Sequence, residues 1–302
     1  NIFFNGLFLF ASNSYLSNYA DDNTLFSLGN NFGKVINNLK IDFTIVENWF
    51  YENYMVLTPD KCYFMSIGKE TKDTIFEIEN TTLDNCSEVK ILGVTIDSKL
   101  TFKSHIKSLC VKASQKINAL ARLSFVLNQQ QKKLIFNSMI KSQFSYCPLV
   151  WMFCQRNSNN MINKTHERAL RIINNDYTND FNTLLSINNE ISIHQRNIQA
   201  LMVEVYKVKN SIAPPIMDTI FKKRQKIYDI RNFQQFETKG KRTVNYGLES
   251  VEYRSPQLWS MVPIDLRETE TLSQFKNKIK KWICRTCPCR LCKMFVQNLG
   301  YL

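Results

Sequence analysis

The sequence predicts an α+β protein in which a front part of strands and one helix is followed by a mainly helical remainder. Its 302 residues are 44% hydrophobic, an ordinary value for a chain with a packed core. Short apolar runs typical of strands dominate residues 1–100, whereas apolar residues recur at helical spacing from Leu100 onward. Charge changes at the same place. Residues 1–100 carry 7 Lys/Arg and 13 Asp/Glu, a net of −6, so the total of +13 leaves +19 for residues 101–302.

The front part is predicted to place strands on either side of one long helix. Residues 23–28 alternate partly and predict a strand that leaves a turn. Residues 34–52 repeat apolar side chains at helical spacing and predict a helix laid on a core. Beyond Pro59, which breaks this pattern, the expected elements are a strand over 61–68, a hairpin within 69–86 and a strand over 89–97 that bends at Gly93.

The second part is predicted to be helical as far as Asn174. Three apolar groups mark its helices: Ile106, Leu109, Ala113, Ile117 and Leu120; Leu134, Ile135, Met139 and Ile140; Met161, Ala169, Leu170 and Ile173. Pro148 and the polar residues 155–160 separate the last two groups. Farther along we expect a helix over 193–210 stopped by Pro214-Pro215, a basic loop over 222–245, a mixed segment around Pro256 and Pro263, and a helix over 272–283.

Composition narrows the class of protein. The opening apolar run is about half the length of a membrane-spanning helix and lacks the basic start of a signal peptide, so we expect no membrane association. Five scattered cysteines, expected to be buried reduced thiols, indicate an intracellular protein, in cytoplasm and nucleus. They are Cys62, Cys86, Cys110, Cys147 and Cys154. The first residue is Asn1, which suggests a fragment or a processed product.

The most informative short motif is a pair of adjacent carboxylates, Asp21 and Asp22, at the edge of an apolar segment. Carboxylate oxygens are ligands that suit Mg²⁺, and two such ions about 4 Å apart can drive nucleotidyl transfer. The dipeptide by itself is more typical of a polar hairpin turn, because Asp and Asn favour turns.

The neighbours of this pair resemble a known family. The chain contains, in this order, an apolar lead-in, YADD, a short strand, a long helix, a lysine-bearing strand and a strand with a Leu-Gly step. This order is similar to that of the reverse transcriptases of non-LTR retrotransposons, particularly the jockey-like elements of animal genomes. Tyr19-Ala20-Asp21-Asp22 matches motif C of that family, ENYMVLTPDKCYFMSIG resembles motif D, and VKILGVTIDSKLTFKSHI resembles the block around the primer grip. Later segments, FNSMIKSQFSYCPLVW, ERALRIIN and YGLESVEYRSPQLWSMVPIDLR, also resemble the family, so the likeness covers nearly the whole chain.

The resemblance implies a division of the chain into four parts. These are the C-terminal part of a polymerase palm, built from antiparallel strands plus a helix (1–100), an all-α thumb-like region (101–175), a basic C-terminal extension (176–283) and a Cys-rich tail (284–302). It also implies RNA-directed DNA synthesis with an RNA template, a DNA primer and dNTPs as partners. Asp21 and Asp22 would hold Mg²⁺, Lys61 would assist the departure of pyrophosphate, and the region of Gly93 would support the primer.

The family places two further motifs upstream of motif C. Motif A supplies an Asp that binds both metal ions, and motif B holds template and nucleotide; no Asp precedes Asp21 here. We therefore expect a fragment that lacks the fingers and the first part of the palm and does not polymerise alone. The alternatives are a non-catalytic nucleic-acid-binding relic of such an element, or a genomic fossil without function.

The tail contains four closely spaced cysteines, Cys284, Cys287, Cys289 and Cys292. Tetrathiolate Zn²⁺ sites use such C-x2-C pairs, although the loop between the pairs is usually longer than here. The alternative is a terminal run of reduced thiols. No histidine is close in sequence, which argues against a CCHC knuckle, and His105, His166 and His194 are expected to be structural.

Basic residues in three segments are candidates for nucleic-acid contacts, and the alternative is a set of solvated faces. They are Lys222, Lys223, Arg224 and Lys226, then Lys239, Lys241 and Arg242, then Lys276, Lys278, Lys280 and Lys281. Tyr228, Phe233 and Trp282 lie among them and could stack on bases.

Overall fold

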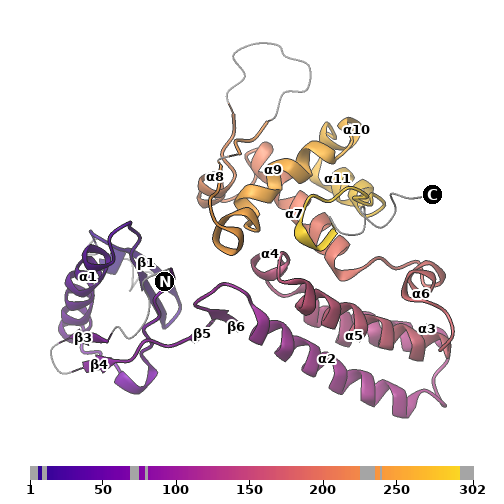
Figure 1. Cartoon of the computed structure of the whole chain (residues 1–302), viewed down its shortest axis with the longest axis horizontal. Coiled ribbons are helices and arrows are strands. Elements are labelled where there is room, and N and C mark those ends of the chain that lie inside the picture. Colours follow the sequence, from indigo (N-terminus) through magenta and orange to yellow (C-terminus); the bar gives the residue numbers. More distant parts are fainter. Residues whose placement is uncertain are drawn as a thin grey trace. The chain divides into compact units, whose positions relative to one another are not determined.

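The computed structural model describes residues 6–8, 12–68, 75–78, 81–224, 235–238 and 240–292. The chain divides into two compact units, Asn1–Val89 and Lys90–Leu302. Small antiparallel sheets and many helices make it a mixed α+β protein, as predicted (Figure 1). The assignment of these units to palm, thumb, extension and tail stays a prediction.

The first unit begins with a tight hairpin of β1 (Tyr15–Tyr19) and β2 (Asp22–Phe26). The antiparallel register pairs Tyr19 with Asp22, so the turn has only two residues, Ala20 and Asp21. Tyr15 and Phe26 face each other at the open end, where their rings stack with centroids 5.2 Å apart. The predicted strand after the Asp pair is thus confirmed, with a partner strand before it.

Helix α1 (Phe32–Glu52) begins at Asn31, whose side chain accepts a hydrogen bond from the backbone N–H of Lys34. This is a normal N-cap, and it confirms the helix expected over 34–52. One apolar face packs against Leu7 and consists of Val46, Trp49 and Phe50. Another group on the same helix packs on Phe64 and Phe76, and its members are Ile36, Leu39 and Phe43.

The prediction of a strand over 61–68 is wrong. A 3₁₀ turn (Pro59–Lys61) occupies its start, and Phe64 makes an isolated parallel bridge to Asn85. The side chain of Asn85 accepts the backbone N–H of Ser66 at 3.0 Å, so that donor is used by a side chain and no ladder extends past it. The hairpin predicted within 69–86 is present as β3 (Phe76–Ile78) and β4 (Thr81–Leu83).

The single bent strand expected over 89–97 is a hairpin instead. Strands β5 (Glu88–Ile91) and β6 (Val94–Asp97) pair with each other. The two residues between them, Leu92 and Gly93, have φ of +46° and +82°. Positive φ at both positions is the mark of a type I′ turn, whose twist suits a two-residue hairpin.

Helices then follow as far as residue 187. They are α2 (Lys103–Leu123), α3 (Gln129–Ile135), a π turn (Phe136–Ile140), a 3₁₀ turn (Lys141–Ser145), α4 (Pro148–Trp151), α5 (Arg156–Asn174) and α6 (Phe181–Ile187). Helices α2 and α5 lie side by side (Figure 1), and their predicted apolar positions meet in one core. The polar residues 155–160, expected as a loop, instead supply the first turns of α5, because only one face of that helix is buried.

A second core surrounds α7 (Ile193–Lys209), which the sequence predicted. Around it pack α8 (Ile216–Ile220), α9 (Val251–Met261), α10 (Ile264–Arg267) and α11 (Leu272–Ile279), with a π turn at Val244–Leu248. Pro256 lies inside α9 rather than ending a helix, and it is buried among that core's residues. The helix expected over 272–283 ends earlier, at Ile279. In the described part of the chain, no helix is both long and apolar enough to cross a membrane.

Candidate metal centre and nucleic-acid surfaces

The Asp pair lies at the exposed tip of the β1–β2 hairpin. Ala20 has φ of +55° and occupies the first turn position, while Asp22 is already the first residue of β2. Hydrogen bonds of Asn18 stabilise the turn, because its side-chain amide donates to Asn23 Oδ1 at 2.8 Å and to the Ala20 carbonyl at 3.0 Å. No third His, Cys, Asp or Glu in the described residues lies close enough to complete a metal-binding group with the pair.

Lys61 is the last residue of the 3₁₀ turn and is exposed. Within the described residues, no ion pair joins it to Asp21 or Asp22, and its role in catalysis stays a prediction. The hairpin and the 3₁₀ turn are separated by α1, which packs against the first and leads into the second.

Gly93 lies at a cleft of about 370 Å³ between the β5–β6 hairpin, α2 and the 3₁₀ turn before Tyr146. The Tyr146 hydroxyl donates to the Leu92 carbonyl at 2.6 Å and so fixes the hairpin tip over the cleft. The lining is rich in cations and hydrogen-bonding groups: Lys90, Thr95, His105, Ser108, Lys112, Ser142 and Gln143.

His105 is the buried polar side chain of this cleft, with 3% of its surface exposed. Its Nδ1 accepts the backbone N–H of Thr95 at 3.3 Å, so the proton of the neutral ring is assigned to Nε2. Burial, together with the charge of Lys112, lowers the pKa of His105 below its usual value. Nε2 has no hydrogen-bond partner among the described residues. The cleft therefore places two lysines beside a buried neutral histidine, and the two lysine charges suit an anion.

The basic residues that are candidates for nucleic-acid contacts differ in their exposure to solvent. Lys222, Lys223, Arg224, Arg242 and the four lysines from Lys276 to Lys281 are exposed. Lys241 is only half-exposed and forms a 2.5 Å ion pair with Glu252. Trp282 is half-buried and packs against the core around α7, and its proposed stacking on bases stays a prediction. Lys226, Tyr228, Phe233 and Lys239 lie outside the described residues.

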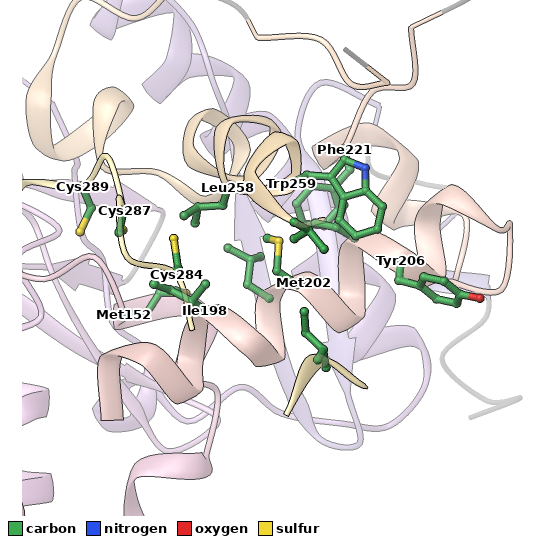
Figure 2. Packing of buried hydrophobic residues seen from close by; sticks show 14 of the residues in the cluster. Met152, Ile198, Met202, Tyr206, Phe221, Leu258, Trp259, Cys284, Cys287 and Cys289 are labelled. Carbon is green, nitrogen blue, oxygen red and sulfur yellow. The ribbon is translucent and has the colours of Figure 1, made fainter. Parts of the chain in front are cut away.

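The tail thiols converge with a histidine that is distant in sequence. His194, the second residue of α7, places Nε2 3.8 Å from Cys287 Sγ and 3.4 Å from Cys289 Sγ. With Cys292 Sγ, these donor atoms all lie within 4.8 Å of one another. Cys284 lies outside this group, and its Sγ is 4.0 Å from the sulfur of Met261. Figure 2 shows Cys284, Cys287 and Cys289 at the edge of the core that contains Ile198 and Met152.

The structure thus places beside the thiols a histidine that is not close to them in sequence, and the structural role expected for His194 stays a prediction. Sequence spacing could not reveal the partner, because 95 residues separate His194 from Cys289. Burial lowers the pKa of His194, but hydrogen bonds that its protonated ring donates to the sulfurs of Cys287 and Cys289 outweigh burial and raise the pKa to about 10. Hydrogen bonds from Cys284, Cys289 and Cys292 hold the pKa of Cys287 below its ordinary value.

The other cysteines differ in exposure. Cys110 and Cys154 are buried, as expected, and burial raises the pKa of Cys154 to about 12. Cys62 and Cys86 are half-buried, and Cys147 is exposed because it lies in the turn that begins α4. The buried-thiol expectation is wrong for Cys147.

Comparison with known proteins shows that the sequence of the chain is similar to that of a polymerase from a transposable element. It is 24% identical over 164 residues, 52% of its length, to a probable RNA-directed DNA polymerase from transposon BS of Drosophila melanogaster. This similarity confirms the resemblance to a retrotransposon reverse transcriptase. The chain spans only 18% of the length of that relative. No protein-family model matches the chain, and no solved structure matches it significantly.

Proposed function

We propose that the chain is the C-terminal part of a reverse transcriptase of a non-LTR, jockey-like retrotransposon, acting inside the cell on an RNA template and a DNA primer. The observation that carries this proposal is the combination of similarity to a transposon RNA-directed DNA polymerase with a YADD sequence at the tip of a two-residue hairpin. An exposed carboxylate pair at such a tip can reach a metal ion held from the other side by a second segment.

In this proposal, Asp21 is the Mg²⁺ ligand of motif C and Asp22 its weaker neighbour. Lys61 protonates the departing pyrophosphate. The β1–β2 sheet has no third strand among the described residues, and Tyr15, Tyr19 and Phe26 are exposed on it. A strand carrying motif A would cover this sheet and supply the carboxylate that bridges both metals. Because the chain contains no match to motifs A and B, it does not polymerise alone.

The second unit holds the nucleic acid in this proposal. Two features support this role: the net charge of +19 in residues 101–302, and the cleft beside Gly93, which offers Lys90 and Lys112. A primer phosphate bound in that cleft would pair with both lysines. Exposed basic residues, among them Lys222, Lys223 and Arg224, would add backbone contacts along the strand.

The test is primer extension by three proteins. The first is the pure chain, the second a fusion that adds an upstream palm segment with motifs A and B from the Drosophila relative, and the third that fusion with Asp21→Asn. We expect magnesium-dependent extension by the second protein only. Extension by the pure chain would refute the claim that its catalytic site is incomplete. An active Asp21→Asn fusion would refute the role of Asp21 as a metal ligand.

The basic second unit also supports an alternative function, a non-catalytic nucleic-acid-binding relic. The two candidates differ in the fusion experiment, because a relic binds primer–template without ever extending it. Binding measured by fluorescence anisotropy should survive Asp21→Ala under either function. Failure of the fusion to extend a primer, together with intact binding, would favour the relic.

A further inference from the structure

The cluster formed by His194, Cys287, Cys289 and Cys292 has the dimensions of a metal site. A tetrahedral zinc ion with Zn–S of about 2.3 Å and Zn–N of about 2.05 Å separates two sulfurs by about 3.8 Å, and a sulfur from a nitrogen by about 3.6 Å. The observed distances from Nε2 to the two sulfurs are 3.8 and 3.4 Å, and every pair of donor atoms lies within 4.8 Å. An ion at the centre requires only small side-chain adjustments.

We propose that these four side chains bind one structural zinc ion. Thiolates and imidazole are the ligands that favour Zn²⁺ over hard cations such as Mg²⁺. Four protein ligands close the coordination sphere, and burial of His194, Cys287 and Cys289 leaves no open position for a substrate. This zinc ion therefore stabilises the fold and takes no part in nucleotidyl transfer.

Two other uses of the cluster fit the structure less well. A nucleophilic cysteine must be reached by its substrate, but Cys289 is fully buried and Cys287 is 3% exposed. A disulfide between any two of the three thiols would leave the third thiol and the imidazole buried together without a function. Only a metal ion uses all four donor atoms at once.

The proposed ion connects two distant segments of the second unit. His194 lies at the start of α7, and the cysteines follow α11, so the site joins residues up to 95 positions apart. Hydrogen bonds already hold the tail nearby: Gln199 donates to the Trp282 carbonyl at 2.8 Å, and Arg290 donates to Asn245 at 3.0 Å. A metal cross-link of such a long loop adds stability by restricting the unfolded chain.

The site differs from the four-cysteine arrangement that the sequence suggested, and the difference can be measured. A Cys₄ site needs Cys284 and does not need His194. The site proposed here needs His194 and does not need Cys284, whose sulfur lies beside Met261. Cys86→Ser, in the first unit, controls for the general effect of losing a thiol.

The experiment measures bound zinc in the purified full chain, kept reduced and dialysed, by plasma mass spectrometry. We expect about one zinc per chain in the unmodified protein, in Cys284→Ser and in Cys86→Ser. His194→Ala and Cys287→Ser should lose the metal, whereas His194→Cys should keep it by completing a Cys₄ set. Zinc retained in His194→Ala and lost in Cys284→Ser would overturn the proposed ligand set.

A second measurement covers the case in which a variant fails to fold. Cobalt(II) titrated into the metal-free, reduced wild-type chain should give tetrahedral visible absorption and a thiolate-to-cobalt charge-transfer band at one equivalent. Removal of the metal should also make the segment after Trp282 more sensitive to protease. Absence of bound zinc together with absence of the cobalt bands would refute the site, whatever the result of primer extension.

Discussion

His166 shows how one buried side chain can control the pH dependence of stability. It is 1% exposed, stacks on Phe136 with ring centroids 5.4 Å apart, and meets the ring of Phe181 edge-on. Neither ring nitrogen has a hydrogen-bond partner among the described residues. Burial lowers the pKa of His166 to about 4 from an ordinary value of 6.5. Between these two values the unfolded chain binds a proton that the folded chain does not, so stability rises with pH.

We therefore predict that His166→Phe removes part of the acid sensitivity of the protein. Relative to wild type, the variant should gain stability as pH falls from 6.5 to 4, by on the order of 3 kcal/mol at the lower end. Denaturant unfolding at pH 7, 6, 5 and 4 measures this gain. Parallel stability curves for the two proteins over this range would contradict the buried neutral state of His166.

Asp97 organises the turn that leads into α2. Phe102, at the N-cap of α2, has a left-handed backbone and supplies no side-chain cap. Instead, the Asp97 carboxylate accepts the backbone N–H groups of Thr101 at 3.0 Å and Phe102 at 2.6 Å. We predict that Asp97→Ala costs about 1–3 kcal/mol of stability, because the backbone amides of Lys99, Thr101 and Phe102 lose a charged acceptor. Chemical denaturation measures this loss; Asp97→Asn should lose less, and equal losses would indicate that the charge contributes nothing.

At the scale of elements, the β5–β6 turn depends on backbone freedom at Gly93. Its φ of +82° is unfavourable for other residues, although a Cβ there would meet Tyr146 at an acceptable 3.6 Å. We predict that Gly93→Ala destabilises the second unit by about 1–2 kcal/mol, whereas Gly93→Asn, which tolerates such a backbone, costs less. Thermal melting of both variants tests this. If the turn also supports the primer, Gly93→Ala should weaken primer–template binding more than stability alone explains.

The elements also show what the sequence could and could not predict. Periodicity predicted α1, α2 and α7, because each carries apolar side chains at helical spacing that are buried in a core. It failed over 61–68, where a hydrogen bond from the Ser66 backbone N–H to the Asn85 side chain replaces strand pairing, and at 155–160, where an exposed first turn of α5 looks like a loop. The hairpin at Gly93 was missed because VKILGVTID contains no Asn-Gly or Asp-Gly turn signal.

The candidate site residues also differ in how far they could be predicted, depending on whether they are adjacent in sequence or meet only in the folded chain. The Asp pair could be predicted because its two carboxylates are adjacent in sequence and lie at one hairpin tip. The ligand set of the thiol cluster could not, because His194 reaches the cysteines only after α7 and the segment beyond α11 have packed on one core. No spacing rule relates a helix start to a tail more than 90 residues away.

At the scale of the whole molecule, the uneven charge predicts how nucleic-acid affinity responds to salt. Lysines of α11 are exposed, and Lys276 and Lys280 are four residues apart, so they lie on one face. Each lysine that contacts a phosphate releases counterions and steepens the salt dependence of binding, by about 0.7 in the logarithmic slope for single strands. Lys241 provides a matched control, because its ion pair with Glu252 already neutralises it.

We predict that the double variant Lys276→Gln/Lys280→Gln lowers this slope by about 1.4 for single-stranded RNA. Lys241→Gln should change the slope little. Fluorescence anisotropy between low and physiological salt measures both variants, and their melting curves verify that the fold is intact. A double variant with an unchanged slope would show that these lysines form only a solvated face. Nucleic acid would then have to bind elsewhere in the second unit, with the cleft of Lys90 and Lys112 and the exposed residues Lys222, Lys223 and Arg224 as remaining candidates.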